Sequence, residues 1–468
     1  MKLSHLLSSA LALGVVATAS SAQAFCGFYV AKAGTDLFNE SSKVALVRDG
    51  DRTVITMAND YQGELTEFAM VIPVPTAITR EQVHISDPAL LKHLDAYTAP
   101  RLVEYFDDDP CAPQMIYERM AAGSAQDTFV VTGARKERAR SLGVTIEDEF
   151  TVGEYDIQLL SATQSDGLMT YLDENGYQVP NGAGRILGSY IKQDMKFFIA
   201  KVNLEEQSKT GNEFLRPIAV AFESPKFMLP IRLGTLNARG DQDLFVYALT
   251  REGQVETTNY RTQKIPSGQE LPVYIKDEFP DFYKSMYKTA AKGEGGHGVF
   301  MEYAWDMGWC DPCAADPLSR EQLQELGVFW LGGIGNQKPM PGGLTFRPMP
   351  QAQDVFVTRL HVRYDAKSFP EDLKFKTTGN KQNFQGRYVL RHAFEGDMQC
   401  DAAKDYKKMV NERKEKEVKT LANLTGWDRS DIWEDISSSG KGAKFDVKDK
   451  NEDRGPTWWK DLWGDDGK

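Results

Sequence analysis

The residues best equipped for chemistry lie in the stretch YAWDMGWCDPC, from Tyr303 to Cys313. It ends in a Cys-x-x-Cys pair, Cys310 and Cys313. Such a pair can exchange disulfides with another protein, bind zinc together with two further ligands, or form a structural disulfide. Because no second close Cys or His pair accompanies these cysteines, a metal site is the least favoured of the three.

The five residues WCDPC, beginning at Trp309, resemble the WCGPC active site of thioredoxins. In thioredoxins the first Cys begins a long helix, whose N-terminus lowers the thiol pKa. Here Ser319 and Gln322 form a capping box that places the sustained helix nine residues after Cys310, and Pro317 ends any earlier turn. We therefore favour a structural Cys310–Cys313 disulfide. The alternative is a redox pair, with Cys310 as the attacking and Cys313 as the resolving thiol.

The chain has five cysteines, so at most two disulfides can form within it. Cys26 and Cys111 each lie near the end of an expected strand or helix. A bridge between them would enclose a long loop and stabilise by roughly 4.5 kcal/mol, against about 2 kcal/mol for the short Cys310–Cys313 ring. We predict that Cys26 pairs with Cys111, which leaves Cys400 as the odd thiol.

Other motifs give little support for catalysis, a cofactor or a metal. The sequence contains neither GxSxG nor HExxH. The GEGGHG stretch from Gly293 follows an expected helix and precedes an expected strand, whereas a dinucleotide loop has the opposite order. A hydrolase site assembled from residues far apart in sequence is a third, weaker option.

Three further polar features have structural interpretations. Asp107, Asp108 and Asp109 could bind calcium, but their spacing favours a solvated turn. His361 shares a strand face with charged residues and is expected to face solvent. His392 falls on an apolar strand face, where a core histidine is the favoured interpretation over a metal ligand.

The N-terminus has the features of an export signal. Residues 1–24 combine a basic start, an apolar run from Leu6 to Val16 and the small-x-small site Ala22-Gln23-Ala24. We expect cleavage after Ala24 and a periplasmic or extracellular mature chain. No later run of 18 apolar residues predicts a membrane span. The net charge of −12 argues against nucleic acid as a partner.

Alternating and apolar runs predict an α+β fold of largely antiparallel β-sheets with packed helices. Beyond the signal we expect an N-terminal α+β domain over 25–205, a second over 206–395 that contains the Cys-x-x-Cys loop, a helical segment over 396–436 and a disordered tail over 437–468. Trp458, Trp459 and Trp463 in this tail could contact a protein partner.

Local signals place several elements. Asp49-Gly50 predicts a hairpin turn, Asp87-Pro88 begins a helix, and Gly426 ends the helix expected from Ala402. A short helix is expected to carry Val103 and Phe106. The polar stretch Glu205–Asn212 is expected to be a loop or boundary.

Six motifs across the chain resemble one bacterial family, filed as domain of unknown function 2330. They are FCGFYVA at Phe25, FAMVIPVP at Phe68, TAPRLVEYFDDDPC at Thr98, YAWDMGWCDPC at Tyr303, ELGVFWL at Glu325 and LTGWD at Leu424. The resemblance runs from Phe25 to about Trp427. It implies an exported bacterial protein and implies no reaction, ligand or catalytic residue.

Together these observations favour an exported, non-enzymatic protein with a binding or structural role, stabilised by disulfides. The alternative function is that of a periplasmic thiol-disulfide oxidoreductase that uses the WCDPC motif. The ligand, the partner and the oligomeric state do not follow from the sequence.

Overall fold

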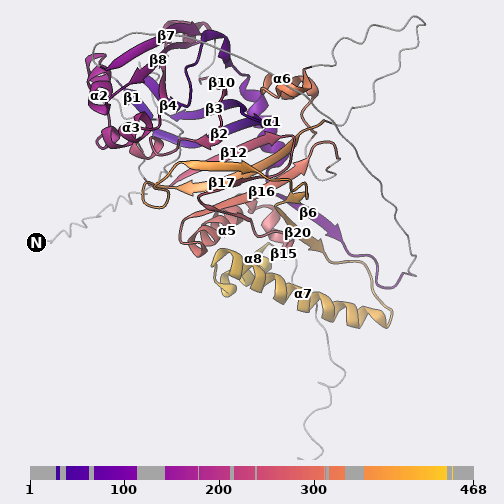
Figure 1. Cartoon of the computed structure of the whole chain (residues 1–468). Helices are drawn as coiled ribbons and strands as arrows, with labels where there is room; N and C mark the ends of the chain where they lie inside the picture. Colours follow the sequence, from indigo (N-terminus) through magenta and orange to yellow (C-terminus); the bar gives the residue numbers. More distant parts are fainter. Residues whose placement is uncertain are drawn as a thin grey trace, which may run out of the picture.

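The computed structural model describes residues 28–31, 38–62, 68–112, 143–177, 179–210, 215–237, 240–309, 311, 316–332, 353–439 and 445. Two large β-sheets pack face to face, and helices cover their outer faces (Figure 1). Cys26, Cys310, Cys313 and the tryptophans of the predicted tail lie outside the described residues.

A nine-stranded sheet forms the centre of the molecule. Its order is β14-β16-β17-β12-β2-β3-β10-β5, and β19 pairs with β16. The strands are β14 (Arg261–Lys264), β16 (Gly298–Asp306), β17 (Phe356–Tyr364), β12 (Gln242–Thr250), β2 (Phe38–Asp49), β3 (Arg52–Gln62), β10 (Ile218–Glu223), β5 (Val83–Ile85) and β19 (Phe384–Gln385). The two predicted β-rich domains therefore share this sheet, because its strands come from both 25–205 and 206–395.

A five-stranded antiparallel sheet packs on one face of the central sheet. Its order is β1-β4-β9-β8-β7, with β1 (Phe28–Ala31), β4 (Phe68–Val74), β9 (Lys196–Val202), β8 (Tyr155–Ala162) and β7 (Val144–Val152). Helices α2 (Ser165–Glu174) and α3 (Ala183–Ile191) cover its outer face. Strand β4 is thus buried on both faces, as its continuous apolar run predicts.

The other face of the central sheet is covered by α1 (Pro88–Thr98), α5 (Phe279–Gly293) and α6 (Arg320–Glu325). Aliphatic side chains of α1 and α6 pack on Ala45, Val47 and Leu249. Phe282, Met286 and Tyr287 of α5 belong to a second apolar cluster that includes Phe300. The predicted α+β class with largely antiparallel sheets is confirmed.

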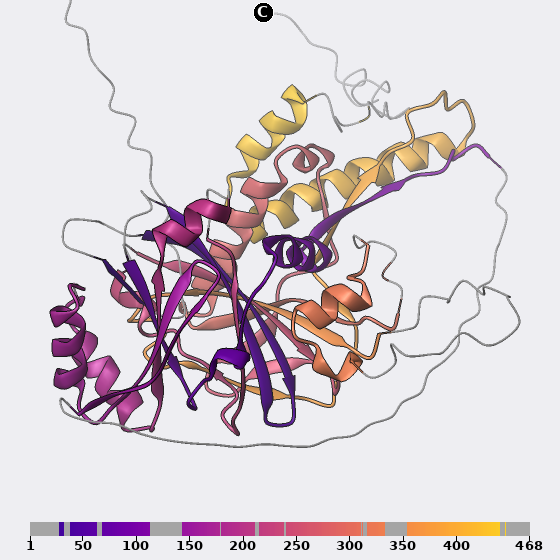
Figure 2. The same cartoon turned by 90° about the horizontal axis from the view of Figure 1, so that it is seen from above.

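A smaller parallel sheet extends from the body together with the C-terminal helices. It has the order β15-β20-β6, with β15 (Gln269–Leu271), β20 (Arg387–His392) and β6 (Arg101–Phe106). Figure 2 shows β6 running beside the long helix α7 (Ala402–Thr425), while α8 (Arg429–Ser438) packs nearer the body. We call β6, β20 and α7 the arm.

The remaining elements are short. A three-stranded sheet has the order β11-β18-β13, with β11 (Met228–Leu229), β18 (Leu373–Thr377) and β13 (Val255–Thr257). Helix α4 (Leu204–Thr210) lies between β9 and β10, and four 3-10 turns are described: Arg80–Gln82, Gly234–Asn237, Val273–Lys276 and Phe329–Leu331. Within the described residues, no helix is long and apolar enough to cross a bilayer.

Several local predictions are confirmed. Strands β2 and β3 form the expected hairpin, with Gly50 at φ 56°. The Asp87 carboxylate accepts a hydrogen bond from the backbone N–H of Ala89 and so caps α1. Helix α6 begins with the capping box of Ser319 and Gln322, and α7 ends at Gly426 in the left-handed conformation.

Two local predictions are wrong. The segment with Val103 and Phe106 is strand β6 instead of a helix, because it pairs along its whole length with β20, far away in sequence. The polar stretch after Leu204 forms α4 instead of a loop. Its start is stabilised by the Asn203 side chain, which accepts hydrogen bonds from the backbone N–H groups of Glu205 and Glu206.

Candidate functional site

The Cys-x-x-Cys motif follows directly on β16, and the described residues around it are held in place. Asp311, between the two cysteines, accepts hydrogen bonds from the Tyr303 hydroxyl at 3.1 Å and from the Gln385 amide at 2.7 Å. The Trp305 indole donates to the carbonyl of Trp309, whose side chain is 48% exposed. Asp311 is therefore anchored to β16 and β19 of the central sheet.

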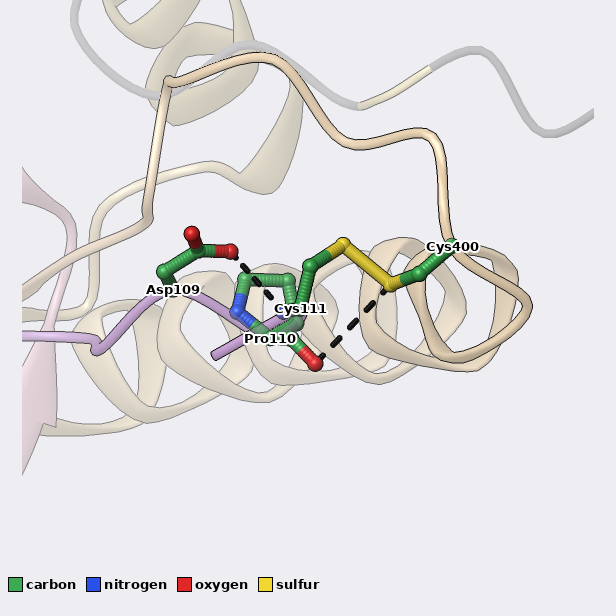
Figure 3. The surroundings of a disulfide bond; sticks show 4 residues. All are labelled: Asp109, Pro110, Cys111 and Cys400. Carbon is green, nitrogen blue, oxygen red and sulfur yellow. Dashed lines mark hydrogen bonds between the residues drawn. A yellow bond between two sulfur atoms is a disulfide. The ribbon is translucent and has the colours of Figure 1, made fainter. Parts of the chain in front are cut away.

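A disulfide joins Cys111 to Cys400, with their Cα atoms 5.7 Å apart (Figure 3). The predicted Cys26–Cys111 pairing is therefore wrong, and Cys400 is not a free thiol. The physical reason is the parallel pairing of β6 with β20, which brings the end of β6 beside the segment that leads into α7. A second link follows the strand pairing, since the Asp107 backbone N–H donates to the His392 carbonyl.

The acidic run Asp107–Asp109 stabilises this end of the arm. Asp107 accepts hydrogen bonds from Arg413 and Tyr406 of α7, and Asp109 accepts one from the backbone N–H of Cys111. In the part of the chain that the structure describes, no group of three or more His, Cys, Asp or Glu side chains could hold a metal ion. The predicted turn is present, but Asp107 is largely buried.

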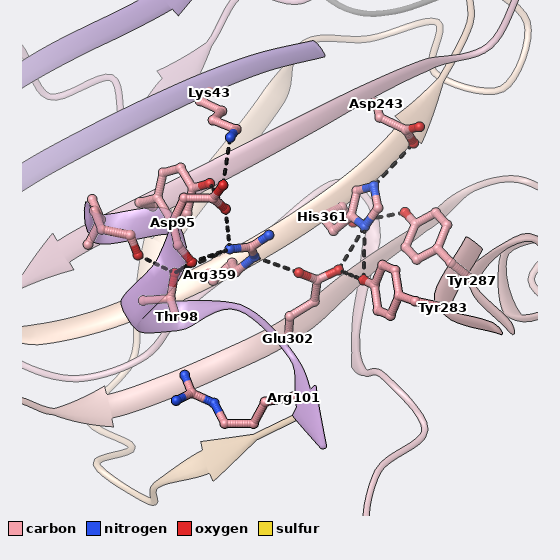
Figure 4. Close-up of polar contacts among 12 residues, drawn as sticks. Lys43, Asp95, Thr98, Arg101, Asp243, Tyr283, Tyr287, Glu302, Arg359 and His361 are labelled. Carbon is pink, nitrogen blue, oxygen red and sulfur yellow. Dashed lines mark hydrogen bonds and ion pairs between the residues drawn. The ribbon is translucent and has the colours of Figure 1, made fainter. Parts of the chain in front are cut away.

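A buried chain of charges lies between the central sheet and the helices α1 and α5 (Figure 4). Arg359 of β17 is 6% exposed and bridges two carboxylates. Its Nη1 lies 2.5 Å from Asp95 of α1, and its Nε lies 2.6 Å from Glu302 of β16. Glu302 is fully buried, yet its pKa is lowered, because Arg359 and His361 outweigh the effect of burial.

His361 is part of this buried chain, so the prediction that it faces solvent is wrong. Its Nδ1 lies 2.7 Å from Glu302 and its Nε2 lies 3.1 Å from Asp243, while Tyr287 of α5 stacks on the ring. Burial acts to lower the pKa of the imidazole, but the two carboxylates raise it overall, which favours the charged ring. Helix α5 covers the face that the alternation assigned to solvent.

The chemistry of this buried group is structural. Both nitrogens of His361 are occupied by carboxylates. Among the described residues, the hydroxyl within hydrogen-bonding distance of the ring is that of Tyr283, not that of a Ser. A general base needs a free nitrogen within reach of a nucleophile and access for a substrate. With Arg359 and Glu302 almost without exposure, the group has neither.

His392 also differs from its prediction. It lies on β20 with a quarter of its side chain exposed, 2.8 Å from Glu104. Its ring stacks on Phe106. It is a half-buried residue of the arm instead of a core histidine.

The strongest candidate for ligand binding is a cavity of about 420 Å³ between the β15-β20-β6 sheet and α7. Charged and polar side chains line it, namely Tyr105, Gln269, Glu270, Arg387, Arg391, Lys416 and Thr420, together with Gly268 and Val389. Arg391 donates to Glu270 through Nε at 3.0 Å and its guanidinium lies over the ring of Tyr105. The size is that of a site for a small molecule.

Glu417 lies one residue after Lys416 and is 4% exposed. Its nearest cation is Arg413, whose Nε is 3.7 Å away, and its Oε1 has no hydrogen-bond partner among the described residues. Burial therefore raises its pKa to about 7. A carboxyl group that is expensive to ionise thus lies next to the cavity.

A family model described as an uncharacterized protein conserved in bacteria, DUF2330, matches residues 20–376. The chain belongs to this family. No curated protein and no solved structure matches the chain significantly.

Membership of DUF2330 confirms the predicted relationship and brings no activity with it. The match ends at residue 376, whereas the sequence motifs predicted a resemblance that extends to about Trp427. Strand β20 and helix α7 follow that point, so Arg387, Arg391 and Lys416 of the cavity lie beyond the matched DUF2330 region. The cavity residues Tyr105, Gln269 and Glu270 lie within the matched DUF2330 region.

Sequence reasoning placed none of the buried charges or cavity residues in a site. One signal was available: Arg359, His361 and Arg363 alternate along a strand, and such a row on a covered face requires buried carboxylates. The partners Asp95, Asp243 and Glu302 come from three other elements and carry no local pattern.

Replacing Arg359 by Met should lower the free energy of unfolding of this DUF2330 protein by about 3–5 kcal/mol, because Glu302 and Asp95 lose their shared cation. Urea denaturation of the purified protein measures this. The control is Arg363→Met, which removes a more exposed partner of Asp243 and should cost about 1 kcal/mol. Equal losses of unfolding free energy in the two variants would show that burying the Arg359 ion pairs adds nothing to stability.

Peptide mapping without reduction should yield a Cys111–Cys400 peptide, and the double variant Cys111→Ala, Cys400→Ala should be about 2–4 kcal/mol less stable. Cys26→Ala is the control, since it should leave that peptide in place. Recovery of a Cys26–Cys111 peptide from the folded protein would contradict the pairing.

Glu417→Gln should stabilise the protein at pH 8 by roughly 3 kcal/mol and have little effect at pH 4. The sign follows because a raised native pKa favours the protonated carboxyl, so wild-type stability falls as the pH rises from 4.5 through about 7. Thermal melting at both pH values measures the difference. Glu412→Gln, an exposed change on the same helix, should alter neither value.

Proposed function

We propose that this DUF2330 protein is an exported, non-enzymatic binding protein that holds a small ligand in the cavity between β20 and α7. The observation that carries the proposal is the cavity itself: about 420 Å³ of space lined by charged and polar side chains. One wall is formed by the sheet and the other by α7, and the Cys111–Cys400 disulfide links the end of β6 to the start of α7. A concave site of this size is typical of small-ligand binding.

Two observations support export. Residues 1–24 have the pattern of a signal peptide with cleavage after Ala24. The disulfide between Cys111 and Cys400 is of the kind that forms in the periplasm or outside the cell, since the cytosol keeps thiols reduced.

The lining of the cavity favours binding over catalysis. Glu270 is committed to Arg391, and the described part of the lining includes no His or Cys that could act with the Thr420 hydroxyl. The anchoring of Asp311 to Tyr303 and Gln385 favours a structural role for the Cys-x-x-Cys loop as well.

Filling the cavity tests the binding function. In a thermal-shift screen of carboxylates, phosphates, neutral sugars and amines, one class at saturation should raise the melting temperature of the mature protein by at least about 2 °C. Thr420→Trp should abolish the shift because the indole occupies the cavity. Thr420→Val, which keeps the side-chain volume, is the matched control and should retain much of it.

A screen without any shift, or a shift that survives in Thr420→Trp, would contradict binding in this cavity. The non-enzymatic part has its own measurement, the reduction of insulin by the purified protein, which should be negligible. Rapid turnover that is lost in Cys310→Ser would instead support the thiol-disulfide oxidoreductase.

A further inference from the structure

We propose that the ligand of this cavity is a small organic anion, whose carboxylate or phosphate group binds between Arg387 of β20 and Lys416 of α7. The inference rests on the proposed binding function and adds the chemical class of the ligand. It depends on the charges that line the cavity, on their partners and on the space between them.

The first step concerns charge. Among the residues that the structure describes, three cations line the cavity, Arg387, Arg391 and Lys416, against one carboxylate, that of Glu270. Glu270 is satisfied by Arg391, with both Nε and Nη2 at 3.0 Å. Neither Arg387 nor Lys416 forms an ion pair with any residue that the structure describes. Two positive charges are therefore left over in a concave site of a chain whose net charge is −12.

The second step concerns direction. Arg387, Val389 and Arg391 alternate along β20 and so share one face of the sheet, which the cavity borders. Lys416 and Thr420 are four residues apart on α7 and lie on one side of the helix, toward the same cavity. An anion between strand and helix would thus receive charge-assisted hydrogen bonds from a guanidinium on one side and an ammonium on the other.

The third step concerns size. A water molecule occupies about 30 Å³ in the liquid, so a volume of about 420 Å³ far exceeds what an inorganic ion needs. The rest of the lining suits the remainder of an organic molecule. Tyr105, 44% exposed, offers an aromatic ring, and Gln269 and Thr420 offer neutral hydrogen-bonding groups.

Isothermal titration of the mature protein at low salt tests the ligand class with citrate as the carboxylate probe and glucose 6-phosphate as the phosphate probe. Glucose is the neutral control. At least one anion should bind, and adding 0.5 M NaCl should weaken it. Arg387→Ala and Lys416→Ala should each raise the dissociation constant about tenfold or more.

Lys408→Ala is the matched control, because Lys408 is an exposed lysine of α7 outside the cavity lining. It should leave the affinity unchanged. Arg387 and Lys416 are exposed, so their variants should melt at the wild-type temperature, which separates a lost contact from a lost fold.

Binding of citrate alone assigns a carboxylate ligand, and binding of glucose 6-phosphate alone assigns a phosphate ligand. Either result supports the proposal if Arg387→Ala and Lys416→Ala weaken the binding of that anion. Failure of both anions, or binding that these two variants leave intact, would overturn it. The compound that raises the melting temperature and loses this effect in Thr420→Trp could instead be neutral or cationic. That result would overturn the assignment of an anionic ligand but would leave the proposed binding function intact.

Discussion

The position of Arg359 is the constraint on which the rest of the fold depends. Its guanidinium is buried between Asp95 of α1 and Glu302 of β16, and these two contacts fix a helix and a neighbouring strand to β17. A buried cation is tolerated only when carboxylates surround it, and a buried carboxylate such as Glu302 only when cations do. Each charged residue therefore fixes the position of its partners. His361 contacts both Glu302 and Asp243, so the same constraint extends to Asp243.

As a consequence, the two faces of the central sheet are stabilised by different interactions. The face toward the five-stranded sheet is apolar and packs by shape, with Val44, Leu46 and Val246 among its buried residues. The opposite face combines apolar patches under α1 and α6 with the charged group under α5. Helix α5 must align Tyr283 with Glu302 and Tyr287 with His361, so hydrogen bonds as well as packing define its position.

How far the sequence predicts this structure depends on the range of the interactions. Asp87-Pro88, Ser319 with Gln322, and Gly426 act within one helical turn, and each places its helix end correctly. The alternation in β17 shows correctly that Arg359 and His361 share a face. It does not show what covers that face, because α5 lies some 70 residues earlier in the chain.

The candidate site was beyond prediction for the same reason. Arg387 and Arg391 alternate visibly, but the wall opposite them comes from α7, and β6 reaches the sheet from the other end of the chain. Cys26 was predicted as the partner of Cys111 because both lie near the ends of expected strands or helices. Neither that placement nor a comparison of loop lengths shows the parallel pairing of β6 with β20 that selects Cys400.

The disulfide also sets an order of events during biogenesis. Cys111 is synthesised 289 residues before Cys400, and Cys26 is already present when it appears. An oxidising enzyme that joined the first two cysteines to emerge would trap the arm strand in a bond that the native fold does not contain. Oxidation of the chain reaches the native bond only if Cys111 stays reduced until Cys400 is present, or if a wrong Cys26–Cys111 bond is later exchanged.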